Sequence, residues 1–135
     1  MIDARLLYED ETWGWGDYQP IIDALGKVVI QVDDEDYQGD SRVLYRDGDK
    51  VGYLQFGWGS CSGCDALQGC NDMTDLQALV NELEASVKWF DSIPEAYEFF
   101  KTHDWRGDYS YHMEEQKKFV ETCLKYLAPL ESYRD

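Results

Sequence analysis

The chain is poor in basic side chains and has no long apolar run, and both shortages restrict what it can bind. It has 12 Lys and Arg against 28 Asp and Glu, which gives a formal net charge of −16. Such a charge repels phosphate backbones and anionic lipid headgroups at long range. No apolar stretch approaches the roughly 20 residues that a membrane helix needs. We therefore expect no direct binding to nucleic acid and no membrane segment.

Sequence signals of export and of common enzyme classes are also missing. Residues 1–5 lack the basic-then-apolar pattern of a secretion signal, which predicts a cytoplasmic protein. The chain has no Gly-rich phosphate loop, no nucleophile elbow and no His-Glu-x-x-His motif. We therefore expect that the protein is not an enzyme.

The composition instead predicts one folded domain that spans residues 1–135. A chain of this length is the usual size of a single domain, and it contains no repeat, linker or low-complexity tract. Its residues are 44% hydrophobic and 15% aromatic, which is too rich for a disordered acidic tail. The acidic charge should therefore lie on a folded surface.

The first half of the chain predicts a short helix and three strands. Residues 18–25 could form the helix, with Asp17 placed to cap it and Gly26 placed to end it. Strand-like runs follow at 27–32, 42–46 and 51–58. Gly48 lies between the last two runs, where a hairpin turn needs positive φ. Together these runs predict a three-stranded antiparallel meander.

The second half predicts helices. Apolar residues recur at helical spacing over 73–87, and Thr74 and Gln77 are placed as a capping box. Ser92 and Pro94 are typical of a helix start, which predicts a short helix over 96–101. A further helix is predicted over about 113–127, with Cys123 in its apolar stripe.

Three of the four cysteines lie within ten residues and predict a metal site. Cys61 and Cys64 have the two-residue gap that directs both sulfurs at one ion, and Cys70 follows after five residues. A disulfide framework is not expected in a reducing cytosol. We therefore predict structural Zn²⁺. The predicted fold class is α+β, a three-stranded antiparallel sheet with three to four helices and a zinc-stapled cysteine loop.

The fourth zinc ligand is predicted to be His112, because it directly precedes a helix that would fix its position. His103 and Cys123 are the alternatives, although a cysteine inside an apolar stripe usually behaves as a small hydrophobe. The Cys-x-x-Cys pair is also compatible with redox chemistry, and plain packing of the cysteines is a third interpretation.

Two stretches carry a resemblance to a known family. Residues 56–65 read Phe-Gly-Trp-Gly-Ser-Cys-Ser-Gly-Cys-Asp, and residues 103–112 read His-Asp-Trp-Arg-Gly-Asp-Tyr-Ser-Tyr-His. Both resemble a family of small acidic proteins of phages, prophages and bacteria, over about residues 43–127. Within it, the chain is most similar to metal-containing anti-CRISPR proteins. The resemblance implies a phage-type viral protein that acts in the bacterial host cell, where it binds a type II RNA-guided DNA endonuclease and blocks DNA engagement or cleavage.

The negative charge is compatible with such a partner, because an RNA-guided nuclease carries basic channels for its nucleic acids. The candidate contacts to this nuclease form one acidic run: Asp33, Asp34, Glu35, Asp36 and Asp40. A second acidic group consists of Glu9, Asp10, Glu11 and Asp17. Either group is also compatible with an ordinary solvated loop.

Two other functions remain open at this point. One is a bacterial regulatory or immunity module in which zinc only stabilises the fold. The other is a zinc-dependent enzyme with Asp65 or His112 as general base, although three thiolates make the ion a poor Lewis acid.

Overall fold

The computed structural model describes residues 2–10, 12–35, 38–59, 63, 65–105 and 113–132. The strands are β1 (Val28–Asp33), β2 (Gly39–Asp47), β3 (Lys50–Trp58) and β4 (Lys88–Phe90). The α-helices are α1 (Gln19–Leu25), α2 (Met73–Ser86), α3 (Ile93–Thr102) and α4 (Met113–Ser132). Two 3-10 turns, η1 (Ala4–Leu6) and η2 (Thr12–Trp15), precede them.

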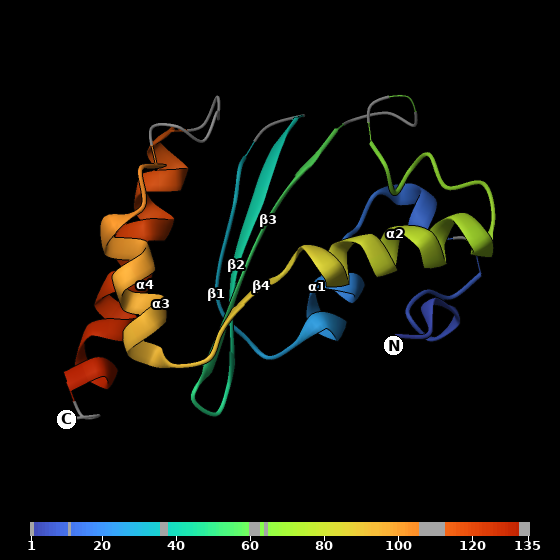
Figure 1. The fold of residues 1–135 in the computed structure, drawn as a ribbon. Helices are drawn as coiled ribbons and strands as arrows, with labels where there is room; N and C mark the ends of the chain where they lie inside the picture. Colours follow the sequence, from blue (N-terminus) through green and yellow to red (C-terminus); the bar gives the residue numbers. More distant parts are fainter. Residues whose placement is uncertain are drawn as a thin grey trace.

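The four strands form one antiparallel sheet in the order β1-β2-β3-β4, placed between two helical layers (Figure 1). Helices α1 and α2 cover one face, and α3 and α4 cover the other. The α+β class is therefore confirmed, with one strand more than the sequence predicted. No helix among the described residues combines the length and the apolar composition needed to cross a bilayer.

Side chains of the central strands alternate between two cores, because successive residues of a strand point to opposite faces. Val43 and Tyr45 of β2 point to the α2-side core, whereas Leu44 between them points to the α4-side core. The α2-side core includes Ile21, Ile22, Val43, Tyr45, Leu54, Leu76, Val80 and Leu83. The α4-side core includes Leu44, Val51, Phe90, Ile93, Phe100, Phe119, Cys123 and Leu127. The sheet thus separates two independent apolar layers.

The hairpin between β2 and β3 confirms the predicted turn. Asp47 pairs with Lys50, so two residues form the loop. Gly48 has φ 61°. A type II′ turn places a glycine at this first central position.

β4 was not predicted, because three residues are too few to show an alternating pattern. It pairs with β3 in the register Val51↔Phe90 to Tyr53↔Lys88. Val87, expected in the preceding helix, instead has extended backbone with φ −67° and ψ 123°. The chain therefore leaves α2 directly into a strand at the sheet edge.

The start of α2 corrects the predicted capping box. Asp72 is the N-cap and accepts a hydrogen bond from Asp75 N at 2.9 Å, while Asp75 accepts from Asn71 N at 2.9 Å. The reciprocal pair therefore lies two residues before Thr74 and Gln77. The Gln77 amide instead accepts from Ala4 N at 2.9 Å and donates to Ile2 O at 2.7 Å, which attaches the N-terminal turn to α2.

The other helix boundaries agree more closely with the sequence. Asp17 accepts a hydrogen bond from Gln19 N at 3.0 Å, and Gly26 ends α1. Ser92 caps α3 by accepting from Glu95 N at 3.2 Å. Helix α4 extends past the predicted residue 127 and includes Pro129.

Candidate functional site

The predicted metal ligands fall only in part on the described residues. Cys61, Cys64 and His112 lie outside them, whereas Cys70 lies within. Among the described residues, no group of three or more His, Cys, Asp or Glu side chains could hold a metal ion.

Cys70 ends a short turn that begins at Asp65. Its thiol donates to Ala66 O at 3.3 Å, and its carbonyl accepts from Trp13 Nε1 at 3.2 Å. Burial raises the pKa of the Cys70 thiol, and the negative charges of Asp75, Asp65 and Asp72 raise it further. This surrounding favours the neutral thiol, which is the opposite of what a low-pKa redox cysteine needs. A bound cation would reverse this preference.

Asp65 fixes the backbone on both sides of the cysteine motif. Its side chain is buried, and Oδ2 accepts from Gly59 N at 2.9 Å, at the end of β3. Oδ1 accepts from Leu67 N at 2.9 Å, from Gln68 N at 3.0 Å and from the Tyr18 hydroxyl at 3.0 Å. One carboxylate therefore joins the strand that precedes the motif, the turn that follows it and α1.

Two further bonds strengthen this anchor. Gln68 Nε2 donates to Gly59 O at 3.0 Å, so Gly59 is held through both its amide and its carbonyl. The Tyr18 hydroxyl accepts from Leu67 N at 3.1 Å while it donates to Asp65. Burial raises the pKa of Tyr18, and the Asp65 charge adds to this, so the phenol stays a neutral donor. The described ends of the cysteine segment are thus held in fixed positions.

The two alternative ligands lie in the layer opposite Cys70. Cys123 is fully buried in the α4-side core, where burial alone raises the pKa of its thiol. His103 stacks on Phe99 with ring centroids 4.8 Å apart and also contacts Trp105. Cys70 packs against the α2-side core instead. The sheet lies between these two layers, so neither Cys123 nor His103 joins Cys70 in this conformation. Helix α4, which begins one residue after His112, belongs to the same opposite layer (Figure 1).

The structure also corrects the acidic run proposed as a contact surface. Asp34 is buried, and its Oδ1 lies 2.8 Å from Arg42 NH1, which is also fully buried. Asp34 Oδ2 accepts from Asp40 N at 2.7 Å, and Asp40 Oδ2 lies 3.7 Å from Arg42 NH2. Asp34 therefore neutralises a buried cation and cannot contact a partner from this position. Asp40 is only partly exposed.

Two members of the run do reach the surface. Asp33 and Glu35 are exposed, whereas Asp36 lies outside the described residues. Asp33 accepts two hydrogen bonds from Gln31 Nε2, at 3.0 and 3.1 Å. From the second acidic group, Glu9, Asp10 and Asp17 are exposed, and Glu11 lies outside the described residues.

The buried Arg42 is a feature that the sequence analysis missed. Arg42 lies two residues before Leu44 in β2, and residues two apart in a strand point to the same face. Because Leu44 faces the α4-side core, strand alternation alone predicts that the Arg42 side chain also points inward. A buried cation needs an acidic partner, and the acidic loop after β1 contains one. The two-residue spacing between Arg42 and Leu44 was the signal available in the sequence.

No protein-family model, curated protein or solved structure matches this chain.

Proposed function

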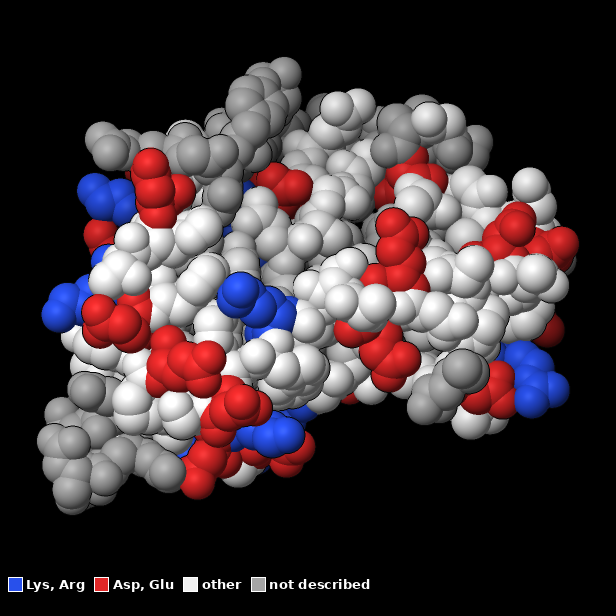
Figure 2. All heavy atoms as spheres, viewed as in Figure 1, with Lys and Arg blue, Asp and Glu red and all other residues white. Residues whose placement is uncertain are grey.

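We propose that this chain is an acidic inhibitor that binds a type II RNA-guided DNA endonuclease and blocks its engagement or cleavage of DNA. The observation that carries the proposal is the distribution of charge. Most described Asp and Glu side chains are exposed, and they are spread over both helical layers with few Lys and Arg among them (Figure 2). A surface of this kind attracts a basic partner from every direction of approach.

The identity of the partner follows from the resemblance of residues 56–65 and 103–112 to anti-CRISPR proteins. Basic channels that hold the guide heteroduplex and the displaced strand are a general property of RNA-guided nucleases. An acidic protein that enters such a channel competes with DNA for the same cationic side chains. Inhibition is therefore stoichiometric, with no substrate turned over.

One hollow of the described surface suits a first contact with a basic partner. Asp17 and Asp33 both line a pocket of about 220 Å³ together with Gln19, Gln31 and Trp58. One exposed residue of each acidic group, Asp17 and Asp33, thus lines the same hollow between the start of α1 and the end of β1. We propose Asp33 and Glu35 as the centre of the partner-binding surface, with Asp17 on the same hollow as Asp33 and the partly exposed Asp40 as a weaker contact, whereas Asp36 lies outside the described residues.

The test is a titration of guide-loaded type II nuclease with this protein, with DNA binding and DNA cleavage measured at two salt concentrations. We expect inhibition at about one equivalent and weaker inhibition at the higher salt, because salt shortens the range of exposed charges. The Asp33→Lys/Glu35→Lys variant should inhibit less than the natural chain. The matched control is Glu82→Lys/Glu84→Lys, which makes the same charge change on the exposed face of α2.

The result that would end this proposal is the absence of both inhibition and a complex on a sizing column at about a tenfold molar excess, where a specific complex would be saturated. The bacterial regulatory or immunity module would then be the better assignment. Equal losses in both charge-reversal variants would keep the inhibitor but remove Asp33 and Glu35 as its contact surface.

We further propose that Cys61, Cys64 and Cys70 bind one structural Zn²⁺, with His112 as fourth ligand, which would have to reach this site from the residue before α4 in the opposite layer. The half-exposed Cys70 thiol and the anchored ends of the segment, at Gly59 and Asp65, support a site at this end of β3.

Elemental analysis should find about one zinc per chain. Cys70→Ser should lower the zinc content, whereas Cys123→Ala should leave it unchanged because Cys123 lies in the opposite core. Zinc that is retained after His112→Ala would exclude His112 as a ligand.

A further inference from the structure

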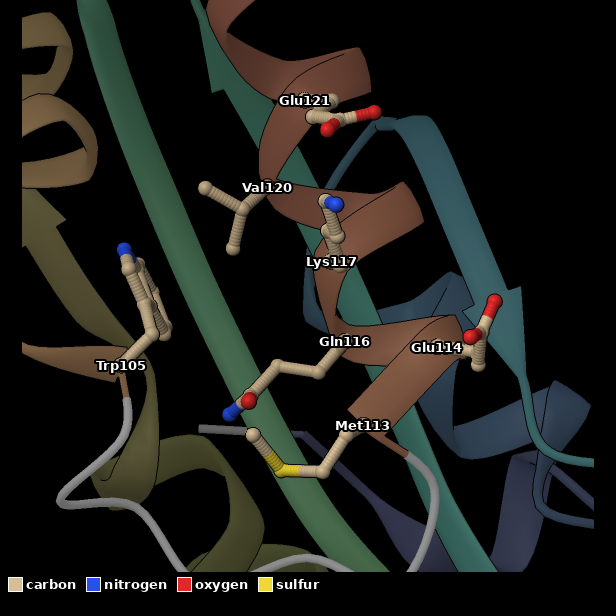
Figure 3. A pocket seen from close by; sticks show the side chains of 7 residues that line it. All are labelled: Trp105, Met113, Glu114, Gln116, Lys117, Val120 and Glu121. Atoms are coloured by element: carbon tan, nitrogen blue, oxygen red, sulfur yellow. The ribbon is translucent and has the colours of Figure 1, made fainter.

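A second pocket lies on the other side of the sheet, between Trp105 and the first turns of α4 (Figure 3). Its volume is about 330 Å³. Met113, Gln116 and Val120 extend from α4 toward the side on which Trp105 lies. Residues 106–112, which join Trp105 to α4, are outside the described part of the chain. Neither the charge distribution nor the cysteine motif uses this pocket.

Gln116 gives the pocket its chemical specificity. The residue is only 2% exposed, and its Nε2 has no hydrogen-bond partner among the described residues. An amide N–H₂ group in such a position costs free energy unless an acceptor reaches it. This donor lies just beneath the lining of the pocket, and a small rotation of the Gln116 side chain would bring it to an acceptor such as a carbonyl oxygen.

The walls of the pocket are apolar and partly rigid. Trp105 stacks on Phe100 with ring centroids 5.6 Å apart and an interplanar angle of 16°. Its indole Nε1 donates to Phe100 O at 3.1 Å, so this donor is already satisfied. Val120 and Met113 complete the apolar lining, and Met113 is 45% exposed at the rim. A methionine there can adapt its shape to an incoming group.

Charge is confined to the rim. The side chains of Glu114, Lys117 and Glu121 are exposed and leave α4 on the sides that do not face Trp105 (Figure 3). The charged lining residues lie at the rim, so a charged group at the centre of the pocket would lose its hydration beside the uncharged side chains of Trp105, Gln116 and Val120. The geometry therefore selects a neutral apolar group that carries one acceptor.

We propose that this pocket receives one apolar side chain of a polypeptide partner, whose backbone carbonyl accepts a hydrogen bond from Gln116 Nε2. The volume is at the lower end of the roughly 300–1,000 Å³ of small-molecule sites, which suits a single large side chain with its peptide group. Tryptophan and methionine are enriched at protein interfaces, and a polar rim around an apolar centre is typical of a binding hot spot. The inference goes beyond the proposed function, since it holds for any polypeptide that presents such a side chain.

The test uses N-acetyl-L-phenylalaninamide, which carries an aromatic side chain between two carbonyl groups. It is titrated into ¹⁵N-labelled protein while the Trp105 indole and Gln116 side-chain signals are followed by NMR. We expect saturable shifts of both signals with Kd on the order of 1 mM, as for a single side chain. N-acetylglycinamide, which has no side chain, should shift neither signal.

Gln116→Met removes the donor and nearly keeps the shape of the side chain. We expect it to fold and to weaken binding about fivefold or more, as the loss of one buried hydrogen bond predicts, with the Trp105 signal as the remaining probe. Gln38→Met makes the same change at an exposed position outside the pocket and should bind like the natural chain. The proposal is overturned if the natural chain shows no saturable shift at Trp105, or if Gln116→Met binds the probe as tightly as the natural chain does.

Discussion

Asp65 shows how much of this fold depends on one polar residue. Its two oxygens accept four hydrogen bonds, from Gly59, Leu67, Gln68 and Tyr18. A buried carboxylate is costly unless it is fully hydrogen-bonded, and these four donors meet that need. Cys61 and Cys64 lie between Gly59 and Asp65 in the sequence, so the same residue fixes where the chain leaves β3 and where the turn before Cys70 begins.

Asp65→Asn should therefore destabilise the protein by about 1–3 kcal/mol, as expected when a buried polar group loses its partner. The new amide group cannot accept at both ends, so Gly59 N–H or the Leu67 and Gln68 N–H groups lose their acceptor. Urea unfolding measures the change in the free energy of unfolding. Asp47→Asn, at an exposed position of the β2–β3 hairpin, is the control and should change it little. Equal stability of the Asp65→Asn variant would contradict the anchoring role.

Two buried tyrosines, Tyr18 and Tyr45, and the partly buried Tyr8 should make the protein sensitive to alkaline pH. Burial raises the pKa of Tyr8, Tyr18 and Tyr45 above the ordinary 10.0, and nearby carboxylates add to it, Asp23 in the case of Tyr45. Above pH 10 these groups lose protons in the unfolded chain before they do so in the folded one. The unfolded state then binds fewer protons, so stability falls as pH rises.

Unfolding free energies measured from neutral pH to above pH 10 test this expectation. Below about pH 10 these tyrosines should not change the free energy of unfolding. Above about pH 10 the free energy of unfolding should fall progressively as the pH rises. Tyr45→Phe removes one titrating group and the 2.7 Å bond to Ile22 O, so it should lower stability at neutral pH but reduce the alkaline slope. An unchanged slope would mean that Tyr45 does not contribute.

At the scale of elements, the sequence offers both Asp72 and Thr74 as N-cap of α2, and in the structure the N-cap is Asp72. Asp72→Ala removes the acceptor for Asp75 N and should lower stability by about 1 kcal/mol, the usual effect of losing an N-cap. Thr74→Ala, at an exposed position inside the helix, is the matched control and should change stability little or raise it slightly. Thermal unfolding followed by circular dichroism compares the two variants. A larger loss in Thr74→Ala would restore the capping box first predicted from the sequence.

At the scale of the whole molecule, the net charge of −16 should itself limit stability. Like charges repel more strongly in the compact state than in the expanded chain, and salt screens this repulsion. Raising NaCl from about 0.01 M to about 1 M shortens the Debye length from about 30 to about 3 Å, so Tm should rise. Glu82→Gln/Glu84→Gln reduces the charge on an exposed face and should show a smaller rise. A Tm that falls steadily with NaCl would show that attractive ion pairs dominate instead.

The sequence alone determined the features that depend on neighbouring residues. The β2–β3 hairpin follows from Gly48, the start of α3 from Ser92 and Pro94, and the acidic surface from composition. The apolar stripe of α4 correctly predicted that Cys123 is buried, because helical periodicity identifies a packed face. These signals are local, so one sequence is enough to find them.

Only the tertiary structure decided which distant residues meet. In the structure Asp34 forms an ion pair with Arg42, and Asp72 is the N-cap of α2. The Gln77 side chain forms hydrogen bonds with the N-terminal turn and does not cap the helix. The tertiary structure also separated Cys70 from Cys123 by the width of the sheet, which no spacing in the sequence reveals. The physical reason is that a carboxylate or an amide can bond to any suitable partner, and its choice is fixed only when packing brings one partner close and excludes water from the rest.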